Sequence, residues 1–156
     1  MPNYKGHILG GAVTYVALVY SVAQHEQASL LWYAGAFMMC ILGALFPDID
    51  VKSKGQKIFY AVLAILLLLF LYSKRIDLFI AATMLALLPL LVKHRGLFHH
   101  LWFLTLLCVT LGLILGNYLS SHEQMIMWFS YFFLAGTWSH VILDRSFSKI
   151  KYWLKR

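Results

Sequence analysis

Residues 78–116 read LFIAATMLALLPLLVKHRGLFHHLWFLTLLCVTLGLILG and decide the fold class of this chain. A short polar linker joins two apolar segments, each close to the ~20 residues with which a helix crosses a hydrocarbon core about 30 Å thick. The stretch therefore predicts two transmembrane helices. Their linker, HRGLFHH at residues 94–100, places three histidines and an arginine at a membrane boundary.

The rest of the chain has the same character. Of its 156 residues, 62% are hydrophobic and 12% are charged, whereas a soluble domain is about half apolar and a quarter charged. We therefore expect an all-α fold, a polytopic integral membrane helix bundle that forms a single domain over residues 1–156, with a basic tail at 144–156. Apolar runs bounded by polar clusters predict about six spans, at residues 8–23, 30–47, 58–72, 76–92, 100–119 and 125–143.

The distribution of lysine and arginine predicts the orientation. When successive connections are assigned to opposite sides, eleven of the thirteen cations share the side of the N-terminus, and only Lys74 and Arg75 fall on the other. Because cytoplasmic loops carry the excess of positive charge, both termini are predicted to be cytoplasmic, in a bacterial inner (plasma) membrane. The basic loops and tail would contact anionic headgroups, and no nucleic-acid partner is expected. The oligomeric state stays open.

The ionisable residues at the predicted helix ends fall on this same positive side. Such groups are costly to desolvate unless they form ion pairs or bind a ligand. A single ligand bound by all of them is the simplest explanation for their common position. His25 and His122 lie on the opposite side in short polar loops and are predicted to be solvated. The residues that converge are His7; Asp48 and Asp50; His94, Arg95, His99 and His100; and His140 with Asp144.

Histidine and aspartate together suit a divalent cation, zinc above all, with manganese or iron as alternatives. His140 and Asp144 are four residues apart and share a helix face. Asp48 and Asp50 follow Pro47, where we expect an extended segment that lets both carboxylates turn the same way. One of the two adjacent histidines, His99 and His100, is expected to be a ligand and the other to contact the ligands or the substrate.

Each motif also has a simpler interpretation. The two aspartates could cap the turn before residue 52, Arg95 could be one more topology charge, and Asp144 could pair with Arg145 or with a lysine of the tail. The joint placement of all these residues on one side favours a metal site, because independent explanations would have to coincide there.

Four motifs in order resemble the YdjM-like family of predicted membrane-bound metal-dependent hydrolases over essentially the whole chain. They are His7 with Gly10 and Gly11, GALFPDID at 43–50, HRGLFHH at 94–100 and SHVILD at 139–144. The first two also resemble the zinc-dependent phospholipase C and single-strand nuclease superfamily, whose helical folds hold clustered zinc ions. The resemblance implies the metal ligands His7, Asp48, Asp50, His94, His99, His140 and Asp144. His100 stands where the related pattern often has a small hydroxyl residue, which leaves its role open.

These features predict a metal-dependent hydrolase of phospholipase type that cleaves a lipid phosphoester at the cytoplasmic headgroup level. A divalent cation lowers the pKa of water from 15.7 toward about 7, and Asp50 or Asp144 could accept the proton. Arg95 is placed to grip phosphate oxygens. His100 is kept as a further candidate for the catalytic group.

Two alternatives have no catalysis. A divalent-metal transporter would carry polar residues near the bilayer midplane, where the third to fifth predicted helices offer only Thr83, Thr105 and Thr110. A metal-stapled membrane scaffold would have no open coordination position.

Overall fold

The computed structural model describes residues 3–22, 29–49, 54–91 and 100–153, which form helices and contain no strand. All six predicted helices are present. Their bounds are α1, Tyr4–Val22; α2, Leu30–Leu45, continued by the 3-10 turn η1, Phe46–Asp48; α3, Lys54–Tyr72; α4, Ile76–Leu91; α5, Leu101–Tyr118, followed by the 3-10 turn η3, Ser120–His122; and α6, Glu123–Trp153.

Four segments of the described chain are long and apolar enough to cross a membrane: Leu30–Asp48, Lys54–Tyr72, Leu101–Tyr118 and Ser120–Ser146. The apolar side chains of α3 are largely exposed, as at Leu68, which suits contact with lipid. The prediction of a membrane helix bundle is thus supported. That α1 and α4 also cross, and that both termini are cytoplasmic, stay predictions.

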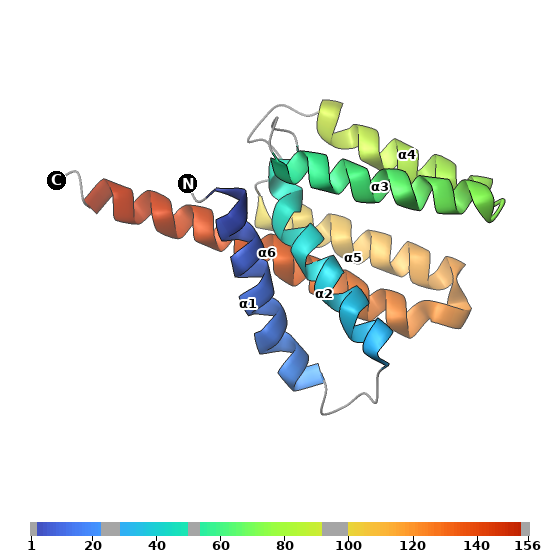
Figure 1. Cartoon of the computed structure of the whole chain (residues 1–156), viewed down its shortest axis with the longest axis horizontal. Helices are drawn as coiled ribbons and strands as arrows, with labels where there is room; N and C mark the ends of the chain where they lie inside the picture. Colours follow the sequence, from blue (N-terminus) through green and yellow to red (C-terminus); the bar gives the residue numbers. More distant parts are fainter. Residues whose placement is uncertain (1–2, 23–28, 50–53, 92–99, 154–156) are drawn as a thin grey trace.

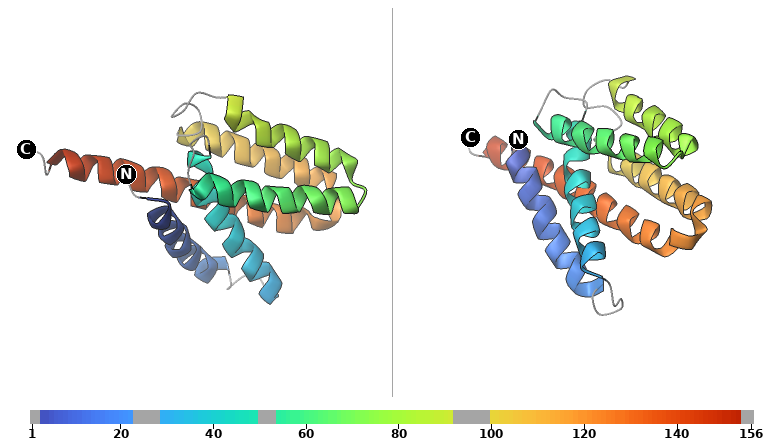
Figure 2. Two further views of the ribbon diagram at one scale, coloured as in Figure 1. Left: turned by 45° about the horizontal axis from the view of Figure 1, so that its top comes forward. Right: turned by 45° about the vertical axis from the view of Figure 1, so that its right-hand side comes forward.

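Helix α6 is the longest helix and the centre of the fold. Figures 1 and 2 show α1 and α2 crossing it side by side, while α5 runs along it and the α3–α4 hairpin lies beyond α5. α6 continues to Trp153, well past residue 143, where the sequence placed the end of the last span. Most of the predicted basic tail is therefore helical.

Glycines allow α1, α2 and α6 to approach closely. A Cβ atom on Gly43 of α2 would collide with the carbonyl oxygen of Phe133, and one on Gly136 of α6 would collide with that of Cys40. A Cβ atom on Gly11 of α1 would lie 2.9 Å from that of Ala44. Small residues at such contacts are how membrane helices gain packing that lipid cannot replace.

Local caps fix where the first two helices begin. The Asn3 side chain accepts a hydrogen bond from the Gly6 N–H (3.2 Å) at the start of α1, and the Ser29 hydroxyl accepts one from the Trp32 N–H (3.2 Å) at the start of α2. The Asn3 cap, four residues before His7, thus fixes the turn that presents this histidine.

Cysteine and threonine side chains inside the bundle are bound to backbone carbonyls or buried. Cys40 and Cys108 are buried free thiols, and the Cys40 thiol donates to the Gly11 carbonyl at 3.3 Å. Thr83 and Thr105 donate to carbonyls of their own helices, at 2.8 and 2.7 Å. Within the described chain both threonine hydroxyls are therefore bound to their own helices.

An apolar cluster holds the end of the α2–η1 segment against its neighbours. Phe46 and Ile49 pack there with Leu104 of α5 and Val141 of α6, and Ile49 and Leu104 are fully buried. Because Asp48 lies between the two residues supplied by this segment, the cluster fixes the backbone that carries its carboxylate.

Candidate metal centre

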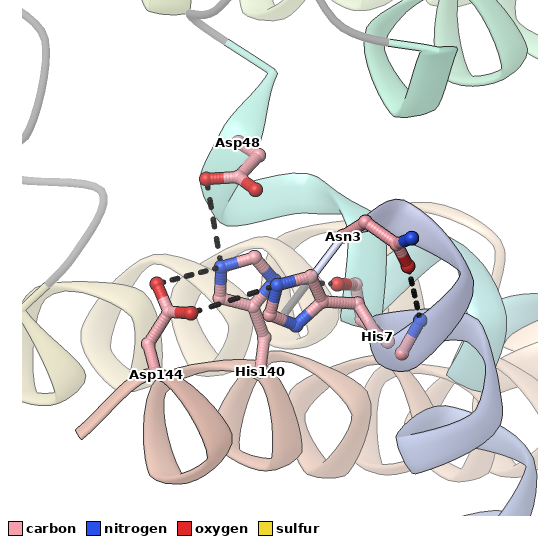
Figure 3. A network of polar contacts seen from close by, with 7 residues as sticks. Asn3, His7, Asp48, His140 and Asp144 are labelled. Carbon is pink, nitrogen blue, oxygen red and sulfur yellow. Dashed lines mark hydrogen bonds and ion pairs between the residues drawn. The ribbon is translucent and has the colours of Figure 1, made fainter. Parts of the chain in front are cut away.

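Three ionisable side chains are buried together where α1 meets α6 (Figure 3). His7, His140 and Asp144 are 1%, 0% and 8% exposed, and each offers a potential ligand atom within 4.8 Å of the others. Burying ionisable groups is costly unless they are compensated. The cluster is thus a candidate site rather than a chance meeting of surface residues.

The Asp144 carboxylate faces both histidines from one side (Figure 3). Its Oδ1 atom is 3.6 Å from Nε2 of His7, and its Oδ2 atom is 3.7 Å from Nε2 of His140. His140 and Asp144 face the same way because they are one turn apart on α6, as the sequence predicted. The alternative in which Asp144 pairs only with Arg145 or with a lysine of the tail does not account for its contacts with the two histidines.

Asp48 approaches the same imidazole from η1, with its Oδ1 atom 3.6 Å from Nε2 of His140. The prediction of an extended segment after Pro47 is wrong, because residues 46–48 form a 3-10 turn. The Ile49 N–H donates to the Phe46 carbonyl (3.1 Å) and closes this turn. Proline fits the first turn of a helix, where its missing N–H is not needed. The Asp48 side chain is 30% exposed and forms the open edge of the site.

The orientation of His140 is fixed from behind. Its Nδ1 atom lies 2.7 Å from the Ala44 carbonyl oxygen, an acceptor, so Nδ1 carries the proton and donates it. In the neutral imidazole, Nε2 then presents its lone pair toward Asp48 and Asp144. Metal-ligating histidines are typically held by such a bond from the other ring nitrogen.

The two imidazole rings are stacked, with centroids 3.7 Å apart and planes 15° from parallel. The Nδ1 atom of His7 is buried and has no hydrogen-bond partner within the described part of the chain. Two cationic rings at this distance would repel one another, so at least one of the two rings is neutral. Neutral imidazole nitrogen is the form that binds metals.

The separations suit ligands of one cation better than direct hydrogen bonds. Nitrogen–carboxylate distances of 3.6–3.7 Å exceed the roughly 2.7–2.9 Å of charge-assisted hydrogen bonds. Ligands at about 2.0–2.1 Å from a tetrahedral ion would lie about 3.3–3.4 Å from one another. His7, His140 and Asp144 therefore fit a divalent metal in both donor type and spacing, and Asp48 adds a second carboxylate next to His140.

The structure brings together four of the nine predicted site residues: His7, Asp48, His140 and Asp144. His100 is described and exposed, at the N-cap of α5 with its ring 6.5 Å from that of Trp102, and is not among the three clustered residues. His122 is exposed and bonds Ser121 at 2.8 Å, as expected of a solvated loop residue. The predictions for Asp50, His94, Arg95, His99 and His25 fall outside the described residues.

One supporting group was missed by sequence reasoning. The carbonyl of Ala44 is a backbone atom, and no side-chain pattern identifies it as the partner of His140. The only available signal was the pair of glycines, Gly43 and Gly136, whose small size lets α2 and α6 approach. Glycine at a helix contact indicates close approach but does not name the groups that meet.

These observations define a membrane helix bundle with a buried histidine–aspartate cluster where α1 meets α6. The chain belongs to the YdjM inner membrane protein family, whose pattern matches residues 1–149. Neither the curated proteins nor the solved structures contain a match.

Proposed function

We propose that this YdjM-family protein is a metal-dependent hydrolase that cleaves a lipid phosphoester at the cytoplasmic headgroup level. One observation carries the proposal: Nε2 of the buried His140 faces carboxylates of Asp48 and Asp144, at 3.6 and 3.7 Å, while its other nitrogen is bound to Ala44. In the neutral ring, a lone pair aimed at two carboxylates is unfavourable unless a proton or a metal ion lies between them, and separations of 3.6–3.7 Å favour the metal ion.

The charge of the cluster favours a divalent ion. Two neutral histidines and two ionised aspartates sum to a charge of about −2, which one divalent cation neutralises. Mixed nitrogen and carboxylate donors favour zinc, with manganese or iron as alternatives. Such a cation supplies Lewis acidity and lowers the pKa of water from 15.7 toward about 7.

The residues of the chain divide the remaining tasks. Both oxygens of Asp144 face histidine nitrogens, which makes it a ligand, so we assign proton acceptance to Asp50. His94 and His99 would complete the metal ligands and Arg95 would hold phosphate oxygens, with His100 as a further candidate group. These assignments rest on the sequence motifs and on the resemblance to the YdjM-like family.

The position of the cluster supports a lipid substrate. His7 lies one turn into α1, and Asp48 ends the membrane-length segment Leu30–Asp48. A site at the ends of spanning segments lies at headgroup level. A phosphoester there is within reach without leaving the bilayer.

The test uses the full chain in liposomes of mixed phospholipids, loaded with zinc or manganese, and follows the release of phosphate or headgroups. We expect release by the wild type, loss of release in His140→Ala, and unchanged release in the matched control His122→Ala. Metal flux without hydrolysis would instead support a transporter. Bound metal with neither flux nor hydrolysis would support a metal-stapled scaffold, and either result contradicts the enzyme.

A further inference from the structure

The first turn of α3 contacts two of the three segments that carry the site side chains, the turn of Asp48 and the helix of His7. The Gln56 amide donates a 2.8 Å hydrogen bond to the Ile49 carbonyl, directly after Asp48. The Lys54 ammonium lies 5.5 Å from the ring centroid of Tyr4, which is three residues before His7 on α1. One helix terminus thus joins the turn of Asp48 to the helix of His7.

The hydrogen bond from Gln56 completes the anchoring of Ile49. Its N–H donates to the Phe46 carbonyl (3.1 Å), its carbonyl accepts from Gln56, and its side chain is fully buried. An anchored backbone at Ile49 restricts the ψ angle of Asp48 and hence the direction in which its carboxylate points.

Asp48 depends on this anchor more than the other clustered residues do. Its side chain is 30% exposed, compared with 11% for Asp144 and 0% for His140. A partly exposed side chain has fewer packing contacts to hold its rotamer. The backbone of η1 is therefore the main determinant of the 3.6 Å separation between Asp48 and His140.

We infer that Gln56 is a positioning residue of the metal site, which directs Asp48 toward His140 by holding the Ile49 carbonyl. The inference rests on the metal site of the proposed function and adds a residue that belongs to none of its ligand motifs. Partners of this outer kind change metal affinity by about 10–100-fold when they are removed.

The test is metal affinity, measured by titrating cobalt(II) and zinc into the purified, metal-free full chain. Gln56→Leu keeps the size of the side chain but removes the donor, and is expected to weaken affinity about tenfold. The matched control Gln124→Leu makes the same change at an exposed position of the first turn of α6, and its affinity should equal that of the wild type.

A double-mutant cycle separates positioning from a general loss of structure. If Gln56 acts through Asp48, Gln56→Leu will weaken metal binding in the wild type but not in the Asp48→Asn background. The cobalt(II) absorption spectrum of Gln56→Leu should also shift toward that of Asp48→Asn. Additive losses with an unshifted spectrum would overturn the inference.

The outcomes distinguish this inference from the proposed function. Wild-type protein that binds no metal refutes both. Wild-type protein that binds metal, with equal affinity in Gln56→Leu, refutes the positioning role alone. If Gln56→Leu does not fold, Gln56→Asn replaces it, because its amide is one methylene too short to reach Ile49, and the same tenfold loss is expected.

Discussion

The Nε2 atom of His140 lies 3.6 Å from Oδ1 of Asp48, although one residue belongs to α6 and the other to the turn after α2. The contact depends on the close approach of α2 and α6 at Gly43 and Gly136. It also depends on the hydrogen bond between His140 Nδ1 and the Ala44 carbonyl, which fixes the orientation of the imidazole ring. Packing of the helices and chemistry of the site are therefore linked, and each can be tested separately.

Metal should stabilise the fold. Because the cluster is assembled only in the folded chain, a metal at 100 times its Kd is expected to add about 2.7 kcal/mol to the free energy of unfolding. Thermal unfolding in detergent, with zinc and then with excess chelator, measures this increment. It should be absent in His140→Ala and intact in His122→Ala, and an equal increment in both variants would show that zinc binds elsewhere.

The contact between α2 and α6 should not tolerate a side chain at Gly136. The Cβ atom of Gly136→Ala would collide with the backbone of Cys40, which cannot rotate away, so we expect a loss of about 2 kcal/mol or more. Gly116→Ala is the matched control, since its Cβ would lie 3.3 Å from the flexible Glu123 side chain. Similar unfolding temperatures for the two variants would contradict the close packing described for the bundle.

Loss of the cap at Asn3 should loosen the turn that presents His7. Asn3→Ala removes the side-chain acceptor of the Gly6 N–H, leaving its bond to the Asn3 carbonyl (2.9 Å), and is expected to destabilise α1 by about 1 kcal/mol. Amide hydrogen exchange should rise in the first turn of α1. Ser29→Ala removes the corresponding bond at α2 and should raise exchange there instead; faster exchange in α1 for both variants would argue against a local effect.

The orientation can be measured by cysteine labelling. Cys40 and Cys108 are buried. A thiol-reactive reagent should therefore label the cysteine introduced by Lys54→Cys or Ser120→Cys and not the native thiols. Lys54 begins α3 and Ser120 begins the turn between α5 and α6. We expect a membrane-impermeant reagent to label position 54 from the cytoplasm and position 120 from the opposite side. Cytoplasmic labelling of position 120 would overturn the predicted topology.

The sequence predicted those parts of the fold and site that depend on periodicity and charge. The six helices follow from apolar runs bounded by polar residues, and the pairing of His140 with Asp144 follows from their spacing of one turn. The meeting of His7 with these two residues was predicted only as a shared membrane side. Charge counting places residues at one membrane surface but does not fix their distances.

Other features depend on packing and lay beyond the sequence pattern. The 3-10 turn at Pro47 differs from the expected extended segment because Phe46 and Ile49 are both drawn into one apolar cluster. The length of α6 was underestimated because basic residues were taken to end the helix, although lysine and arginine are good helix formers. The Ala44 carbonyl, a backbone group, was identified only from the folded chain.

The central claim is that His7, Asp48, His140 and Asp144 hold a metal, and elemental analysis of the purified full chain tests it most directly. We predict stoichiometric zinc, manganese or iron in the wild type and in His122→Ala, and loss of that metal in His7→Ala and in His140→Ala, with all variants folded by circular dichroism. A folded wild type without bound metal after incubation with each ion, or unchanged metal content in His140→Ala, would contradict the claim.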